Sequence, residues 1–111
     1  MIKLNDKYVF HLPLYKFVNG ELIAIDFNII SDLMDLFSEN GYENAYVMKV
    51  KGYYKSRDFD ELLITIFTSS ERDNIKPDSI FKDWFIKNND ILKQDAFAYE
   101  FNGEMFIFKL K

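Results

Sequence analysis

Two Asn-Gly dipeptides, at residues 19–20 and 102–103, each lie between stretches rich in aromatic and β-branched residues. An Asn-Gly pair in this setting is the strongest short-range signal for a two-residue β-hairpin turn. The first pair joins an expected strand at residues 8–17 to one at residues 22–25, and the second divides the segment at residues 96–110. We therefore predict a hairpin near each end of the chain.

The second turn also predicts the register of the last hairpin. Side chains that face each other directly across two antiparallel strands lie on the same side of the sheet, and aromatic pairs in such positions stabilise it. A two-residue turn gives these opposed pairs: Phe101 with Glu104, Tyr99 with Phe106, and Phe97 with Phe108.

Two segments between the hairpins carry apolar residues at helical spacing. The apolar stripe of the first consists of Ile29, Ile30, Leu33, Met34, Leu36 and Phe37. Asp26 is expected to cap the start of this helix and Gly41 to follow its end. Pro77 suits the first turn of the second helix, and Asn88-Asn89 can end it early. The apolar stripe of the second consists of Ile80, Phe81, Trp84, Phe85, Ile91 and Leu92.

Two further strands, at about residues 45–55 and 62–68, are expected between the helices. The predicted order is thus ββαββαββ, an α+β fold in which an antiparallel sheet carries two helices on one face. Its inner βαββαβ part has the order of a ferredoxin-like core. At 111 residues, the chain is expected to form a single domain over residues 1–111.

Charges are sorted by sign along the chain. Between residues 17 and 48 every charged residue is acidic. On the first predicted helix, Asp32, Asp35 and Glu39 share one stripe, and Glu43 follows. Like charges at helical spacing repel one another, whereas carboxylates gathered on one surface favour association with a cationic partner. We expect this acidic face to bind another protein with a basic surface.

The next block, residues 49–57, contains only basic charges. Because side chains alternate along a strand, its odd positions line one side, which is predicted to be the open side of the sheet, beside two odd positions of the next strand. The set consists of Lys49, Lys51, Tyr53, Lys55, Arg57, Leu63 and Phe67. Such a face can hold a second copy in a homodimer, a small anion or single-stranded nucleic acid, or it can simply keep the sheet soluble.

Motifs for catalysis are lacking in this sequence. There is no cysteine, His11 is the single histidine, and the four glycines are scattered, so the common zinc sites and phosphate-binding loops are excluded. Asp58, Asp60 and Glu61 leave open a metal-dependent enzyme, although Asp is also common in turns. We therefore expect a protein that is not an enzyme and uses no cofactor.

In size, acidity and lack of catalytic motifs, the chain resembles bacterial toxin-immunity proteins, antitoxins and phage-encoded inhibitors, which act by stoichiometric binding. The net charge of −4 argues against nucleic acid as a general partner. No segment has the length of a membrane-spanning helix. The cysteine-free composition favours the reducing cytoplasm.

Overall fold

The computed structural model describes residues 1, 3–54, 56–69 and 74–110. In chain order its elements are β1 (Asp6–Pro13), β2 (Tyr15–Val18), β3 (Glu21–Ala24), the 3-10 helix η1 (Phe27–Ile30), α1 (Ser31–Glu39), β4 (Ala45–Tyr54), β5 (Arg57–Thr68), α2 (Pro77–Lys87), α3 (Asn89–Leu92), β6 (Ala96–Phe101) and β7 (Glu104–Lys109).

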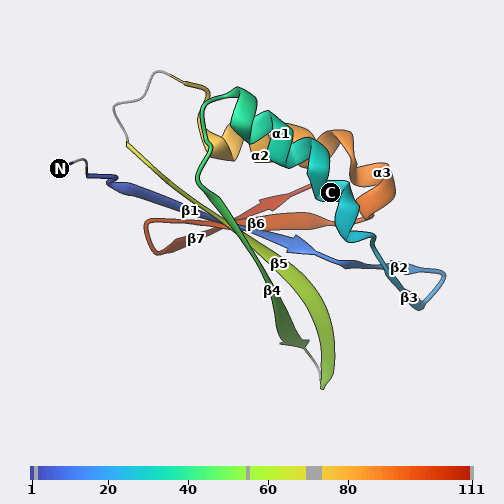
Figure 1. Ribbon diagram of the computed structural model, residues 1–111. Coiled ribbons are helices and arrows are strands. Elements are labelled where there is room, and N and C mark those ends of the chain that lie inside the picture. The colour runs from blue at the N-terminus through green and yellow to red at the C-terminus, as the bar shows by residue number, and fades with distance from the viewer. Residues whose placement is uncertain (2, 55, 70–73, 111) are drawn as a thin grey trace.

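Five strands form one antiparallel sheet in the order β4-β5-β1-β6-β7, while β2 and β3 pair in a separate two-stranded sheet. The helices α1 and α2 lie together on one side of the large sheet, and the β2–β3 hairpin projects from one end (Figure 1). The α+β class is confirmed. The ferredoxin-like order is not confirmed, since β2 and β3 leave the main sheet and β7 extends it. No helix in the described part of the chain is long and apolar enough to cross a bilayer.

Both helices begin and end close to where their caps predict. The Asp26 side chain accepts a hydrogen bond from the Asn28 amide at 2.9 Å and caps η1, which runs into α1. Gly41, just past the end of α1, has a left-handed φ of 86°. Pro77 is the first residue of α2, and the helix gives way to α3 at Asn88.

The core lies between the helices and one face of the sheet. Alternate residues of β1 and β5 face the helices in directly opposed pairs: Tyr8 with Ile66, Phe10 with Ile64, and Leu12 with Leu62. The Phe10 ring lies 5.7 Å from that of Phe37 on α1 and 4.6 Å from that of Phe81 on α2. This central ring therefore ties both helices to the middle strand.

The last hairpin has the predicted register. Phe101 opposes Glu104, Tyr99 opposes Phe106, and Phe97 opposes Phe108. The Phe97 and Phe108 rings stack at 5.2 Å, and those of Tyr99 and Phe106 stack at 5.5 Å.

The register of the β4–β5 hairpin differs by one residue from the register that the predicted basic face requires. Tyr54 pairs with Arg57, so β5 begins at Arg57 rather than at about residue 62. In this register Lys49 opposes Leu62 and Lys51 opposes Asp60. A one-residue change in register moves every side chain of a strand to the other face. The basic positions of β4 thus share the face of the sheet that carries the core, and their predicted place on the open face is wrong.

The first predicted strand, residues 8–17, is divided at Leu14. Pro13 has no amide hydrogen to donate and occupies the last position of β1, as expected for proline in a strand. The Leu14 amide donates to the Asp60 carbonyl at 3.0 Å, and the Leu14 carbonyl accepts from the Ile25 amide at 2.9 Å. The first bond holds the start of the β2–β3 hairpin to β5, and the second joins the two ends of the hairpin to each other.

Candidate functional site

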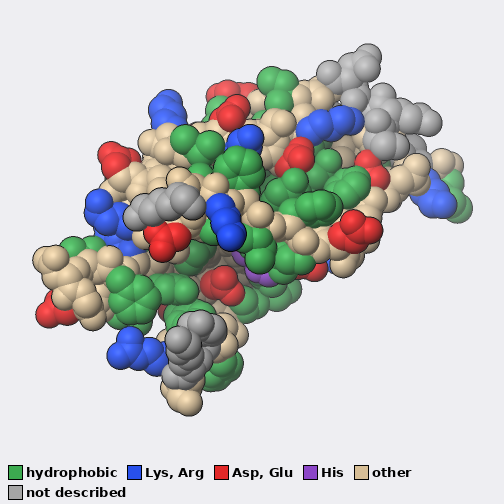
Figure 2. Space-filling view, turned by 180° about the vertical axis from the view of Figure 1, so that it is seen from behind, with side chains coloured by type: hydrophobic (Ala, Val, Ile, Leu, Met, Phe, Trp, Pro, Cys, Tyr) green, Lys and Arg blue, Asp and Glu red, His purple; other side chains and the backbone are tan. Residues whose placement is uncertain are grey.

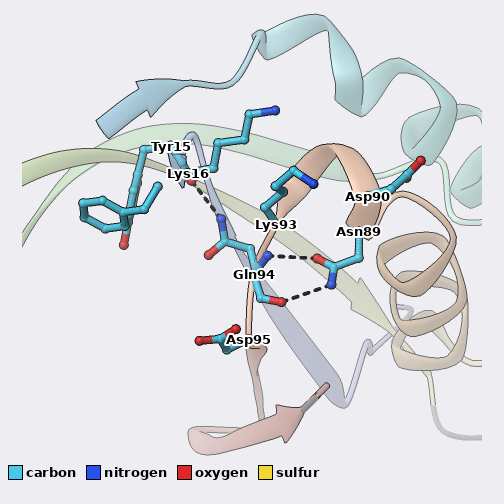
Figure 3. Close-up of a pocket in the computed structure, with 8 residues that line it drawn as sticks. Tyr15, Lys16, Asn89, Asp90, Lys93, Gln94 and Asp95 are labelled. Atoms are coloured by element: carbon cyan, nitrogen blue, oxygen red, sulfur yellow. Dashed lines mark hydrogen bonds between the residues drawn. The ribbon is translucent and has the colours of Figure 1, made fainter. Parts of the chain in front are cut away.

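A pocket of about 600 Å³ lies between β2 and the segment around α3 (Figure 3). Residues from two distant parts of the chain line it: Tyr15, Lys16, Phe17, Asn89, Asp90, Lys93, Gln94 and Asp95. Its volume is within the range of about 300–1,000 Å³ that is usual for small-molecule sites.

Gln94 holds the two sides of the pocket together. Its side-chain amide donates to the Tyr15 carbonyl on β2 and to the Leu92 carbonyl, each at 2.8 Å. Its backbone exchanges two hydrogen bonds of 3.0 Å with the Asn89 side chain. Lys93, with a left-handed φ of 52°, turns the chain from α3 into this arrangement. The pocket therefore has a hydrogen-bonded frame before any ligand enters.

Charges of both signs lie around the frame. The Lys16 ammonium donates to the Ile91 carbonyl at 2.9 Å. In Figure 3, Asp90 lies at the upper right and Asp95 at the bottom, while Lys93 lies near the centre and Lys16 at the top. Neighbouring cations and carboxylates can bind the two charged ends of a zwitterion, because each end meets a group of opposite sign.

Aromatic rings form the remaining wall. Phe17 is 52% exposed, and its ring lies edge-on to Tyr15 at 6.0 Å. The Tyr15 ring also packs against Phe59 at 4.7 Å. Burial, and to a smaller extent the Glu61 carboxylate, raise the pKa of Tyr15 above its usual value of 10.0. Tyr15 is therefore a neutral hydrogen-bonding group at physiological pH.

The predicted acidic face is only partly assembled. Asp32, Asp35 and Glu39 line one groove of about 500 Å³ between α1 and α2, and Asp83 of α2 joins them. Among the described residues, none of these four carboxylates forms an ion pair. Glu43 lies elsewhere and lines a separate depression that includes Tyr46 and Phe67.

The predicted basic face is not formed. Lys49, Lys51 and Tyr53 are on the helix side of the sheet, where the β4–β5 hairpin extends beyond the helices (Figure 1). Arg57, Leu63 and Phe67 alternate onto the opposite side. Lys55 lies outside the described residues.

The lysines on β4 are neutralised within the chain. Lys51 Nζ lies 2.9 Å from one Asp60 oxygen, Lys49 Nζ lies 3.4 Å from the other, and Lys51 Nζ lies 3.9 Å from Asp58. The hydrogen bond with Lys51 lowers the pKa of Asp60, and the same bond raises the pKa of Lys51. These ammonium groups thus have carboxylate partners in their own sheet.

The carboxylates at residues 58–61 do not converge either. Asp58 and Asp60 face the lysines, whereas Glu61 opposes Pro13 and Val50 on the other side of the sheet. Within the described ranges, no three His, Asp or Glu side chains are grouped so as to hold a metal ion.

Sequence reasoning missed the pocket because its two sides are more than 70 residues apart. It also named no partner for His11, the single histidine. In the structure His11 Nε2 donates to Glu100 Oε2 at 2.8 Å on the open face of the sheet. The local sequence carries no sign of this pair, because β1 and β6 meet only in the folded sheet.

Comparison with known proteins found one informative likeness. No family model matches the chain, and no curated protein matches it. A solved structure of a phage SAM lyase in its apo state is similar, with a TM-score of 0.59 and 14% identity over 100% of this chain and 96% of that one. At this identity, the likeness concerns the fold.

This likeness corrects the expectation about catalysis. The chain was expected not to be an enzyme, because no catalytic motif stands out in its sequence. That expectation is contradicted, since a protein that shares the fold over the whole length of the chain is a lyase.

Proposed function

We propose that this protein is an enzyme that cleaves S-adenosylmethionine or a related sulfonium compound, and that the pocket between β2 and α3 binds this substrate. The fold shared with a phage SAM lyase over the full chain is the observation that carries the proposal. Fold alone does not determine function. The chemistry of the pocket supplies a second, independent support.

The parts of S-adenosylmethionine correspond to groups that line the pocket. The molecule combines a zwitterionic amino acid, a positively charged sulfur, a ribose and an adenine ring. Lys16 and Lys93 can bind the amino-acid carboxylate, while Asp90 and Asp95 offer negative charge for the ammonium group and the sulfonium. The exposed Phe17 ring offers a surface on which adenine can stack.

Cleavage of a sulfonium needs little chemistry from the protein. One carbon–sulfur bond breaks, its electron pair goes to sulfur, and the sulfur leaves as a neutral thioether. Either the adjacent carbon gives a proton to water and an alkene forms, or an oxygen of the same molecule attacks the carbon as the sulfur leaves and a ring forms. Positioning the substrate in one reactive conformation is therefore the main contribution expected of a pocket without a catalytic motif.

The test is to incubate the purified chain with S-adenosylmethionine and to follow substrate and thioether by liquid chromatography and mass spectrometry. We expect loss of substrate with matching release of thioether. Lys93→Asn removes a pocket charge while keeping a residue that tolerates the left-handed backbone, so kcat/KM is expected to fall about tenfold or more. The matched control Lys49→Gln removes a lysine outside the pocket and is expected to leave the rate unchanged. An inactive wild-type chain that also fails to bind the substrate in calorimetry would contradict the proposal.

A second candidate function follows from the acidic groove. Four carboxylates and one lysine, Lys87, line the groove together with apolar side chains that include Leu36, Ile80 and Trp84. The Trp84 indole nitrogen is buried with no hydrogen-bond acceptor among the described residues. A groove of this kind is complementary to a basic segment of another protein that also carries apolar residues. Such binding could accompany catalysis.

The triple substitution Asp32→Lys, Asp35→Lys and Glu39→Lys tests this second function. It reverses the charge of the groove, and pull-down of basic partners is expected to be lost while the fold and the lyase activity remain. Unchanged recovery of partners by the variant would exclude the groove as the binding surface. We also propose a cytoplasmic location, which rests on the cysteine-free composition.

A further inference from the structure

The face of the large sheet opposite the helices is apolar as well. Two rows of directly opposed side chains cross all five strands on this side. The first row is Tyr46, Thr65, Val9, Glu100 and Met105, and the second is Met48, Leu63, His11, Ala98 and Ile107. An antiparallel sheet with one face in water usually alternates between apolar and polar residues, so that the exposed face is polar. This sheet departs from that pattern.

Several of these side chains are well exposed. Ile107 is 68% exposed, Tyr46 is 64% and Met48 is 61%. Together with Met105 and Phe67, they present apolar surface on the order of 600 Å², at the upper end of what single-chain proteins expose. Figure 2 shows hydrophobic side chains, in green, beside the purple histidine of this face. A surface of this kind typically belongs to an interface.

The one polar pair in the middle of the face is already satisfied. Each member of the hydrogen bond between His11 and Glu100 has a partner in its own chain. Covering the face would therefore not leave these two groups without a hydrogen bond, and the cost of burying them is reduced.

We propose that this face packs against the same face of a second copy of the chain. A patch that meets its own copy about a two-fold axis must be complementary to itself. The area fits as well, since the exposed side chains and the half-buried ones between them approach the roughly 800 Å² per partner that a stable interface needs. The neighbouring sheets would then form a sandwich, a common arrangement for two apolar sheet faces.

The charges at the two ends of the face also favour a second copy of the chain as the partner. Lys7 lies beyond the first row, beside Phe67, and Glu61 lies beyond the second, beside Pro13. A two-fold axis that runs parallel to the rows, midway between them, places the first row of one copy over the second row of the other. The same axis brings Lys7 of each copy close to Glu61 of the other, so the ends attract one another.

Sedimentation velocity from about 1 to 100 μM tests the proposal, a range that covers interfaces of this size. We expect the wild-type chain to sediment with twice its monomer mass. Met48→Lys and Ile107→Lys each place a charge in the apolar rows, and each is expected to weaken association about tenfold or more. The matched control Ile86→Lys changes an equally apolar, 48% exposed side chain on α2 and is expected to leave the dimer intact. Circular dichroism checks that each variant is folded.

A charge exchange tests the arrangement within the dimer. Lys7→Glu alone places two carboxylates close together across the interface and is expected to weaken association. Adding Glu61→Lys to the same chain restores opposite charges and is expected to recover it. A wild-type chain that is monomeric throughout the range, or a dimer that Met48→Lys and Ile107→Lys leave unchanged, would overturn the proposal. Equal weakening by the single and the double charge variant would also overturn it, because the two-fold pairing predicts recovery.

Discussion

The hairpins β6–β7 and β4–β5 lie on opposite sides of β1 and are held by different forces. In β6–β7, Phe97 is buried and its ring contacts those of Phe81, Phe85 and Phe108 at 5.0–5.5 Å. The outer part of β4–β5 extends past the helices, and ion pairs from Lys49 and Lys51 connect its strands. Removal of aromatic surface from water contributes far more to stability than exposed ion pairs do.

This contrast indicates where the protein is most easily opened. Free energies of local opening are lowest where few apolar contacts are buried. We therefore expect the outer part of β4–β5 to open before β6–β7, and the substitutions below test this difference from its largest consequence to its smallest.

Phe97→Ala is expected to have the largest effect, a loss of about 3–5 kcal/mol in the free energy of unfolding. It removes a buried ring of β6 that packs against Phe81 and Phe85 of α2 and Phe108 of β7, and it leaves a cavity. Chemical denaturation monitored by circular dichroism measures the loss. The control Phe106→Ala truncates a more exposed ring of the same hairpin, and a loss as large as that of Phe97→Ala would show that burial does not account for the difference.

Tyr8→Phe tests the aromatic core beside β6 through the pH dependence of stability. Burial, followed by the nearby Asp78 carboxylate, raises the pKa of Tyr8 well above 10.0. The unfolded chain ionises first, so the stability due to the neutral phenol is present below pH 10 and is lost as pH rises beyond it. Thermal unfolding between pH 8 and 11 is expected to show a smaller alkaline loss in Tyr8→Phe than in the wild type. If the variant lost stability between pH 8 and 11 as steeply as the wild type, groups other than Tyr8 would account for the loss.

Ser56→Gly is expected to stabilise the β4–β5 hairpin by about 0.5 kcal/mol, because Ser56 has a left-handed φ of 63° that glycine adopts without strain. Thermal denaturation measures the change. Lower stability would show that the flexibility of glycine in the unfolded chain outweighs the relief of strain.

Asp60→Asn is expected to have the smallest effect, a slight loss of stability at low salt that disappears at high salt. Because the pKa of Asp60 is lowered in the fold, its contribution is present above pH 3.8 and is lost as pH falls below that value. Denaturation at two salt concentrations checks this. A large loss of stability that persists in high salt would mean that Asp60 stabilises the β4–β5 hairpin strongly, contrary to the difference from β6–β7 described above.

The turn residues explain which parts of the fold the sequence predicts. Asn102-Gly103 specifies a two-residue turn, with φ values of 50° and 86°, and the register of β6–β7 follows from it. The β4–β5 turn has no such dipeptide. The acidic residues at positions 58 and 60 suggest a loop there, so the predicted register was wrong by one residue. Because side chains alternate along a strand, this error assigned the side chains of β4 to the wrong faces of the sheet.

The candidate site was less accessible to prediction for a different reason. The stripe of Asp32, Asp35 and Glu39 is local to one helix, so helical spacing was enough to bring these residues together. The pocket between β2 and α3 depends on Gln94 reaching Tyr15 across 79 positions, and no local pattern reports such a bond.

The departure of the chain from the main sheet at Leu14 has an evolutionary consequence. All four residues of β3 are exposed, and the β2–β3 hairpin is anchored at its base by Leu14 and Ile25. Insertions, deletions and exchanges in this hairpin can reshape one wall of the pocket without altering the buried centre of the domain. Such changes would alter what the pocket can bind, while selection for a folded protein acts mainly on other residues.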